Sequence, residues 1–352
     1  MDLEELLKNG YEEKASDIHF MPGRPVMFRI NGNMNIYGKE NITEAEMEKL
    51  LDIFLTETQR KILEQDGAIE TAVTVFGQFR IRVNAFRQQG SYAVTVRLFA
   101  LKIPGPEEIL LPSGFLDLTR EKKGLILIAG GAGTGKTTTA ASLLHYIAST
   151  EAKHIITIED PVEYVIPHGK GMVSQREIGS EEEEDARAVS AAVRQNADVI
   201  FIGNLNGTQM ISEAVKAAES GCLVIAVLHT LRAEDAVQRI IDSFLNFKRP
   251  EMQRRLSDVL KGIVVQQLLP SRSQEGRCAV FELLLEDKDV SMMIREGRIS
   301  QITDVMEQKR ESGMQTMDDA VLSAYMKSAI SAETALSFAC DRKVMEQRMK
   351  IY

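Results

Sequence analysis

Apolar and polar residues alternate in several stretches of residues 1–100, which is the spacing expected of strands with one buried face. Phe79 to Ala85 places an apolar residue at every second position, and Val94 to Leu98 repeats the pattern. Thr43 and Glu46 form a capping-box signature, and the apolar residues after them recur at helical spacing. The pair Asn31-Gly32 favours a hairpin turn. Residues 1–100 are therefore predicted to form a mixed α+β domain.

A different pattern begins after residue 100. Residues 101–115 contain three prolines and two glycines without periodicity, which predicts a linker. Beyond it come four runs of consecutive apolar residues, at 125–129, 155–158, 199–202 and 223–228. Strands that are buried on both faces have this composition, so a second domain with a largely parallel α/β sheet is predicted to begin near Leu116.

The clearest chemical signal follows the first apolar run. The segment GGAGTGKT matches the phosphate-loop pattern, with a predicted strand before it and a helical repeat after it. We expect it to bind ATP with Mg²⁺, because Lys136 would neutralise the β and γ phosphates and the Thr137 hydroxyl would ligate the metal. The predicted nucleotide-binding residues are Gly130, Gly131, Ala132, Gly133, Thr134, Gly135, Lys136, Thr137 and Thr138.

Polar residues also follow two of the other predicted strands. Glu159, Asp160 and Glu163 surround a proline after the second strand, and they form either a site for Mg²⁺ and water or an acidic turn in solvent. His229 follows the fourth strand, at the sheet edge where ligands of open α/β folds bind, although a lone histidine is more often structural. The acidic run Glu181 to Asp185 is interpreted as the solvated start of a helix.

Arginines share one face of the two strands near the end of the first domain. Arg80 and Arg82 lie on the first of these strands and Arg97 lies on the second. An arginine that faces water is ordinary, so the pattern is equally typical of a solvated sheet surface and of a phosphate-binding surface. The second interpretation requires a phosphate nearby.

Composition narrows the class of protein. The chain has 352 residues, of which 44% are hydrophobic and 26% charged, and no apolar run approaches the roughly 20 residues that cross a bilayer. An acidic, amphipathic N-terminus is unlike a secretory signal, so we expect a cytoplasmic protein. The net charge of −9 disfavours a nucleic-acid partner. The three cysteines are widely spaced and predict neither disulfides nor a zinc site.

Several motifs, in order, resemble the bacterial type II/IV secretion ATPases, and within them the PilT-like type IV pilus retraction motors. The absence of a tetracysteine insert favours the PilT-like branch over the PilB-like and GspE-like branches. The matching segments are ASDIHF at 15–20, FRIRVNAFRQQG at 79–90, TIEDPVEY at 157–164, SQREIG at 174–179, VRQNADVIFIG at 193–203, VLHT at 227–230 and GMQTMDDAV at 313–321.

The resemblance implies a PAS-like N-terminal domain (1–100), a linker (101–115), a RecA-like ATPase core (116–285) and a helical tail (286–352). It implies a ring of six identical chains, or a ring mixed with a paralogue, that meets the membrane only through a platform protein of a pilus or secretion system. It also implies catalytic roles for Glu163, which would help hold Mg²⁺, and for His229. Arg82 and Arg97 would reach the phosphates from the N-terminal domain.

One position departs from the family pattern. The glutamate that acts as general base in the family is replaced by Asn204, which we expect to face Lys136 and Thr137. An amide can hydrogen-bond a water but cannot accept its proton, so hydrolysis should be slower while ATP binding survives. Asn196 likewise replaces an aspartate, and no AIRAG-type motif is recognisable near residues 289–294.

Two functions therefore stay open. The chain is either a working pilus motor, with Glu163 or Glu159 covering for the missing base, or an ATP-binding ring subunit without turnover that scaffolds or tunes an active paralogue. A small-molecule kinase is disfavoured, because that function explains neither the N-terminal domain nor the segment at His229.

Overall fold

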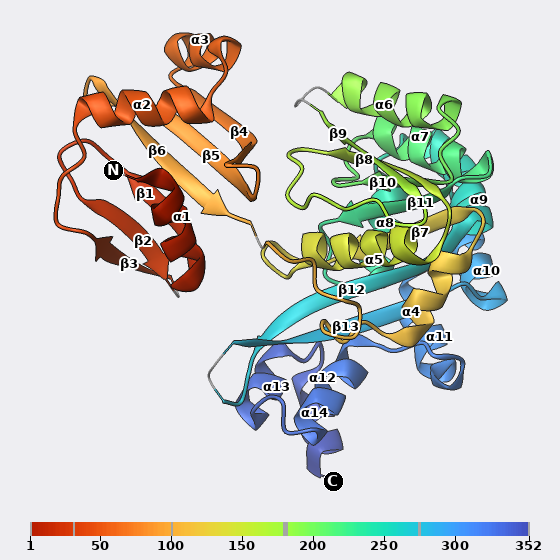
Figure 1. Cartoon of the computed structure of the whole chain (residues 1–352). Coiled ribbons are helices and arrows are strands. Elements are labelled where there is room, and N and C mark those ends of the chain that lie inside the picture. The colour runs from red at the N-terminus through yellow and green to blue at the C-terminus, as the bar shows by residue number, and fades with distance from the viewer. Residues whose placement is uncertain (1, 31, 100, 179–181, 274–275, 351–352) are drawn as a thin grey trace. The chain divides into compact units, whose positions relative to one another are not determined.

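The computed structural model describes the whole chain except residues 1, 31, 100, 179–181, 274–275 and 351–352 (Figure 1). The chain divides into two compact units, which are described separately. The first comprises Met1–Ile103 with the short segment Pro161–Val165, and the second comprises Pro104–Asp160 and Ile166–Tyr352.

The first unit is an antiparallel six-stranded sheet with helices on its apolar face. The sheet order is β3-β2-β1-β6-β5-β4. The hairpin expected around residues 31–32 is confirmed by the pairing of Ile30 with Asn33, although residue 31 itself lies outside the described residues. The elements are α1 (Leu3–Glu12), β1 (Ala15–Phe20), β2 (Val26–Ile30), β3 (Asn33–Tyr37), α2 (Glu44–Phe54), α3 (Glu57–Asp66), β4 (Ala68–Val75), β5 (Phe79–Gln88) and β6 (Ser91–Leu98).

The alternation of apolar residues in β5 explains how this unit packs. Ile81 and Val83 are fully buried, and they share one hydrophobic core with Leu7, Leu51 and Leu63 from the three helices. The capping box predicted at Thr43 is present, with Thr43 and Glu46 bonding each other's backbone N–H groups at the start of α2. The sequence pattern thus fixes both the buried face of the sheet and one helix start.

The second unit is built around a seven-stranded sheet of order β13-β12-β7-β11-β10-β8-β9. Its neighbouring strands are parallel except for β12 and β13. The four predicted apolar strands form its centre, so the expected α/β class is confirmed. The elements are α4 (Ser113–Asp117), η1 (Leu118–Arg120), β7 (Gly124–Ala129), α5 (Lys136–Thr150), β8 (His154–Glu159), β9 (Met172–Glu177), α6 (Glu182–Arg194), β10 (Val199–Ile202), α7 (Thr208–Glu219), β11 (Leu223–Leu228), α8 (Ala233–Asp242), η2 (Asn246–Lys248), α9 (Arg249–Val259), β12 (Leu260–Pro270) and β13 (Arg277–Leu285).

Short helices follow β13 to the end of the described chain. Residues from them, including Ile302, Val321 and Met345, are buried in the same hydrophobic core as the central strands. This packing makes the C-terminal helices part of the second unit. They are α10 (Lys288–Glu296), η3 (Ile299–Gln301), α11 (Ile302–Gln308), η4 (Arg310–Ser312), α12 (Met317–Met326), α13 (Ala332–Phe338) and α14 (Arg342–Lys350).

Three strands of this sheet were not predicted. β9 occupies an edge and has a largely polar sequence, while β12 follows α9 directly with no breaker between Val259 and Leu260.

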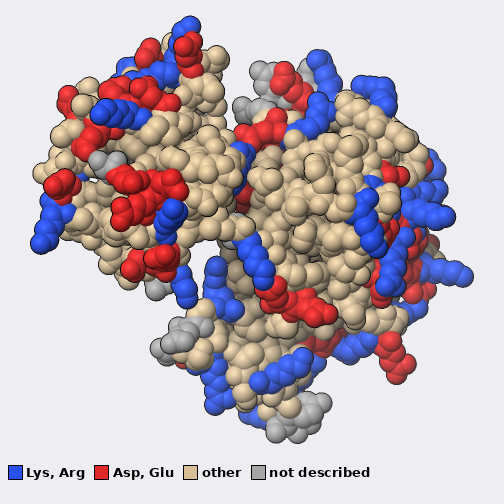
Figure 2. All heavy atoms as spheres, in the orientation of Figure 1, with Lys and Arg blue, Asp and Glu red and all other residues tan. Residues whose placement is uncertain are grey.

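On the face shown in Figure 2, acidic and basic side chains are interspersed. Within the described residues, no helix is long and apolar enough to cross a membrane.

Candidate nucleotide site

The phosphate loop joins β7 to α5 and requires glycine at its entrance. Gly130 has φ of +153°, and a Cβ there would lie 2.5 Å from Thr134 Oγ1 and 2.6 Å from the Gln266 carbonyl oxygen. Gly135, the residue before α5, has φ of +88°, which only glycine adopts readily. The loop therefore leaves no room for a side chain at Gly130 and needs the backbone freedom of glycine at Gly135.

The first turn of α5 carries the groups expected to meet phosphate. Gly135 offers no side-chain cap, so the N–H groups of this turn and the positive end of the helix dipole suit an anion. Lys136 is buried, and its Nζ donates to the Gly131 carbonyl oxygen at 2.6 Å. Thr137 and Thr138 follow in the same turn, half-buried. All nine predicted nucleotide-binding residues thus lie in one loop and helix start.

Sequence reasoning missed a residue that braces this loop. Gln266 on β12 is buried, and its Oε1 accepts a 2.6 Å hydrogen bond from Thr139 Oγ1 in α5. A second support comes from β13, where Arg277 Nη1 donates to the Gly133 carbonyl oxygen at 3.3 Å. Both residues lie on strands that the hydrophobic pattern did not reveal.

Replacing Gln266 by leucine should lower the free energy of unfolding by about 1–3 kcal/mol, because the buried Thr139 hydroxyl loses its acceptor. Urea denaturation measures this change. Gln267→Leu is the matched control, since Gln267 is the next residue on β12 and is only half-buried. Equal stability of the two variants would show that the Thr139–Gln266 bond does not brace the loop.

His229 lies immediately after β11, in the same unit as Lys136. Burial lowers the pKa of its imidazole, and the positive charges of Lys136 and Arg239 lower it further. Arg239 Nη1, from α8, also donates to the His229 carbonyl oxygen at 3.0 Å. The lowered pKa favours the uncharged imidazole, and the positive charge of Lys136 is one of its causes.

The carboxylates after β8 have different surroundings. Glu159 is buried, and its Oε1 accepts a 3.0 Å hydrogen bond from Gln175 Nε2, so it is no part of a solvated turn. Glu163 belongs to the segment Pro161–Val165 of the first unit. Arg80 Nε holds that segment by donating to the Val162 carbonyl oxygen at 2.8 Å.

Asn204 lines a pocket of about 380 Å³ at the carboxyl ends of β8 and β10. The other polar residues of the pocket are Asp160, Asp185 and Asn206, and neither Lys136 nor Thr137 is among its lining residues. Asp185 came from an acidic run interpreted as a solvated helix start. This run comprises residues 181–185, of which residue 181 and the side chains of residues 182 and 183 lie outside the described part of the chain. Asp185 is described, and it lines this pocket. Two carboxylates therefore accompany the amide at the position where the resemblance implies a general base.

The arginine face of the first unit is compensated by carboxylates. Arg82 on β5 and Arg97 on β6 are directly opposite each other, an arrangement that like charges disfavour. Arg82 forms an ion pair with Glu70 on β4, and Arg97 Nε lies 2.9 Å from Asp17 Oδ1 on β1. Each arginine thus holds a carboxylate that a phosphate would have to replace.

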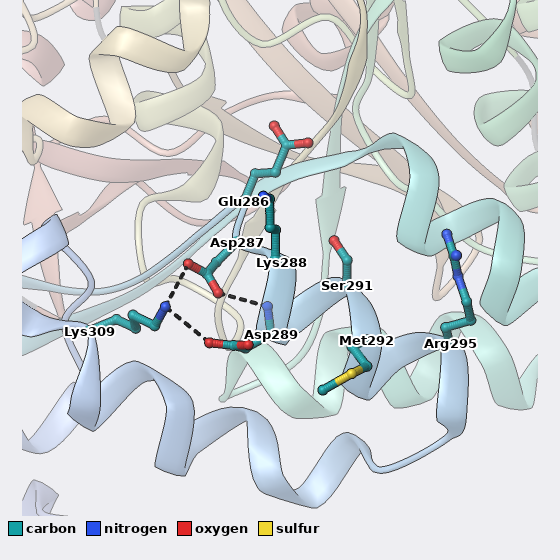
Figure 3. A pocket seen from close by; sticks show the side chains of 8 residues that line it. All are labelled: Glu286, Asp287, Lys288, Asp289, Ser291, Met292, Arg295 and Lys309. Carbon is teal, nitrogen blue, oxygen red and sulfur yellow. Dashed lines mark hydrogen bonds and ion pairs between the residues drawn. The ribbon is translucent and has the colours of Figure 1, made fainter.

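A more voluminous pocket, of about 750 Å³, lies at the start of α10 and has a different character (Figure 3). Its acidic residues are engaged locally, because Lys309 Nζ lies 3.1 Å from Asp287 Oδ2 and 3.0 Å from Asp289 Oδ2. Asp287 also caps α10 through the Asp289 N–H group. These contacts stabilise the helix start, and we assign no nucleotide chemistry to this pocket.

Comparison with known proteins agrees with this geometry. The model of the family described as "Type II/IV secretion system protein" matches residues 1–337. The chain is 34% identical to the type IV pilus ATPase PilU of Pseudomonas aeruginosa, over 96% of this chain and 89% of that protein. It is 31% identical to the pilus retraction ATPase PilT of the same organism, over 95% and 97% of the two chains.

A solved structure shows the same fold. The crystal structure of the pilus retraction motor PilT with bound ADP superposes with a TM-score of 0.90, at 36% identity and 99% coverage of both chains. The fold and site define a P-loop ATPase with a RecA-like core. The chain belongs to the type II/IV secretion ATPase family, as its motifs predicted.

Proposed function

We propose that this chain is a motor ATPase of a type IV pilus that couples ATP binding and hydrolysis to motion between its two units during retraction. The observation that carries the proposal is the glycine-dependent phosphate loop with buried Lys136, in a chain that matches the PilT structure over 99% of its length. Closing around ATP and opening after hydrolysis would convert the chemistry into movement.

Within this function we propose a role for each site residue. The uncapped first turn of α5 and Lys136 bind the phosphates, while the Thr137 hydroxyl, with Glu163, would hold Mg²⁺ to neutralise phosphate charge. His229 and Glu159 complete the catalytic site. Arg82 and Arg97 would exchange their carboxylate partners for phosphate oxygens, which makes them sensitive to bound nucleotide.

Assembly and location follow from the same similarity. We propose a ring of six copies of this chain, or one mixed with a paralogue, on the cytoplasmic side of the inner membrane. Contact with the membrane would run through a platform protein of the pilus or secretion system, and nucleic acid is not a partner. Similarity to pilus ATPases over more than nine-tenths of this chain supports this assignment.

A second function is an ATP-binding ring subunit that tunes an active paralogue without hydrolysing ATP. Asn204 favours it, because an amide cannot take a proton from water. Asp160 and Asp185, which line the same pocket, favour retained turnover, because either carboxylate can accept that proton. We therefore favour a motor that hydrolyses ATP slowly over a ring subunit that does not hydrolyse it.

Steady-state phosphate release from the purified chain, with saturating ATP and Mg²⁺, separates these functions. The motor function predicts a rate above that of Lys136→Ala, which supplies the background. Binding of ATP with release no faster than this background would reject the motor and leave the regulatory subunit.

A further inference from the structure

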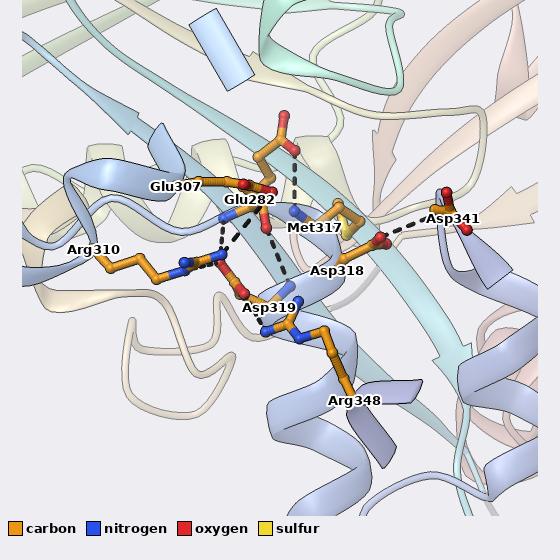
Figure 4. A network of polar contacts seen from close by, with 9 residues as sticks. Glu282, Glu307, Arg310, Met317, Asp318, Asp319, Asp341 and Arg348 are labelled. Carbon is orange, nitrogen blue, oxygen red and sulfur yellow. Dashed lines mark hydrogen bonds and ion pairs between the residues drawn. The ribbon is translucent and has the colours of Figure 1, made fainter. Parts of the chain in front are cut away.

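A buried carboxylate on β13 connects two helix starts that are far apart in the sequence. Glu282 Oε1 accepts a 2.6 Å hydrogen bond from the N–H group of Ala233, the first residue of α8. Its Oε2 accepts a 3.1 Å hydrogen bond from the N–H group of Met317, the first residue of α12. Neither helix receives a side-chain cap at these N–H groups from its own preceding residue. Figure 4 shows Glu282 beside the first turn of α12.

The two hydrogen bonds of Glu282 form a bridge between α8 and α12. On the α8 side, this bridge lies next to the segment that carries His229. His229 and Ala233 bound a short segment between the last residue of β11 and the first of α8. The β11 end is fixed in the central sheet, and the α8 end is fixed by Glu282. Arg239, two turns further along α8, bonds the His229 carbonyl oxygen. The position of α8 therefore sets the position of His229.

The α12 end leads to the C-terminal helices. Asp319, in the first turn of α12, lies 2.8 Å from Arg310 Nε and 2.5 Å from Arg348 Nη2 of α14 (Figure 4). Asp318, its neighbour, accepts a 2.7 Å hydrogen bond from the Cys340 N–H group, which precedes α14. The start of α12 thus contacts both β13 and the segment that includes α14.

We infer that Glu282 is a positioning residue that holds His229 in the nucleotide site through α8 and links this position to the C-terminal helices through α12. The inference rests on the proposed role of His229. Through Glu282, a rearrangement of α12 to α14 changes the position of His229. In the opposite direction, a change of bound nucleotide at the site is transmitted to these helices.

Glu282 is buried, and the groups around it determine the pKa of its carboxyl. Burial raises its pKa to about 7 against the opposing effect of the two N–H donors and of Arg232. The other ionisable groups that face it are Glu234 on α8 and Cys340 before α14, with the two aspartates of the first turn of α12 nearby. Ionisation of Glu282 near neutral pH therefore changes the strength of the bridge.

The experiment follows the imidazole of His229 by NMR in histidine-labelled protein, in the wild type and in Glu282→Gln. The full chain has five histidines, and the His229 signal is assigned by its loss in His229→Gln. In the wild type its pKa lies below the usual value because of burial and Lys136. In Glu282→Gln we expect it to rise towards 6.5, since the released segment gains solvent.

The direction of the change in the His229 pKa distinguishes release of the segment from simple loss of a negative charge. Removing a nearby negative charge without moving the segment would lower the pKa of a histidine, whereas release of the segment raises it. Glu282→Asp provides a second variant, because it keeps the charge but is too short to reach both helices, and it should show the same rise. Circular dichroism confirms that each variant is folded.

Arg348→Ala is the control for general loosening of the tail, because it breaks the contact with Asp319 and leaves both Glu282 bonds in place. It should change the His229 pKa by less than either Glu282 variant does, because Glu282 still holds the start of α8. An unchanged or lowered His229 pKa in both folded Glu282 variants would overturn the inference. Because the readout needs no hydrolysis, it is independent of whether the chain proves to be a motor.

Discussion

Asn204→Glu is expected to raise kcat for ATP hydrolysis by about 10²- to 10⁴-fold, the usual contribution of a general base. Asn204 lies just after β10 and lines a pocket with Asp160 and Asp185. A glutamate there would have a longer reach and an oxygen able to accept a proton from water. The phosphate loop is untouched, so KM for ATP should change little. Phosphate release at several ATP concentrations measures both constants.

Two control variants distinguish the basicity of a carboxylate at position 204 from the effects of side-chain length and of added charge in the pocket. Asn204→Gln has the length of glutamate without its basicity and should stay near the wild-type rate. Asn206→Glu adds a carboxylate to the same pocket at a neighbouring position. If either control accelerates hydrolysis as much as Asn204→Glu, the role assigned to position 204 is wrong.

Lys136→Ala should abolish productive ATP binding, with a loss of affinity on the order of 10²-fold or more, the cost of removing one partner of a buried charge pair. Lys136 is buried at the start of α5, next to the loop that is expected to hold the phosphates. Titration with a fluorescent ATP analogue measures the affinity. Lys122→Ala, at an exposed position before β7, serves as the matched control and should bind as the wild type does.

An affinity of Lys136→Ala within a factor of three of the wild type would contradict the assignment of the phosphate loop. The unfolding transition of the variant, measured without nucleotide, shows whether any loss arises from the fold instead.

The phosphate loop was predictable because its determinants are local. The strand, the glycines and the helix start lie within one short stretch, so sequence alone placed all nine residues in one structural element. The parallel sheet was predictable for a related reason, since strands buried on both faces leave continuous apolar runs. The family resemblance then supplied the order of the remaining motifs.

The supporting contacts were not predictable because they join distant segments. Gln266 meets Thr139 across 127 residues, and Glu282 meets Ala233 across 49. Neither residue belongs to a motif, and β12 begins directly after α9 without a breaker in the sequence. Similarly, the pairing of Arg82 with Glu70 and of Arg97 with Asp17 depends on strand register, which spacing alone does not determine.

Asp185 illustrates a different limit, because the helix start expected at the acidic run is present as α6 while the pocket was not foreseen. A run of acidic residues at a helix start complements the helix dipole, so its interpretation as a solvated surface was physically sound. Only the pocket around Asn204 distinguishes Asp185 from its neighbours. A feature with a sufficient local explanation can still have a second role in the folded chain.

The most direct test of the motor function is to image fluorescently labelled pili on cells that lack this chain. We predict that pili extend but retract rarely or not at all, and that the wild-type chain restores retraction while Lys136→Ala does not. Retraction at the normal frequency and speed in the absence of the chain would contradict the account.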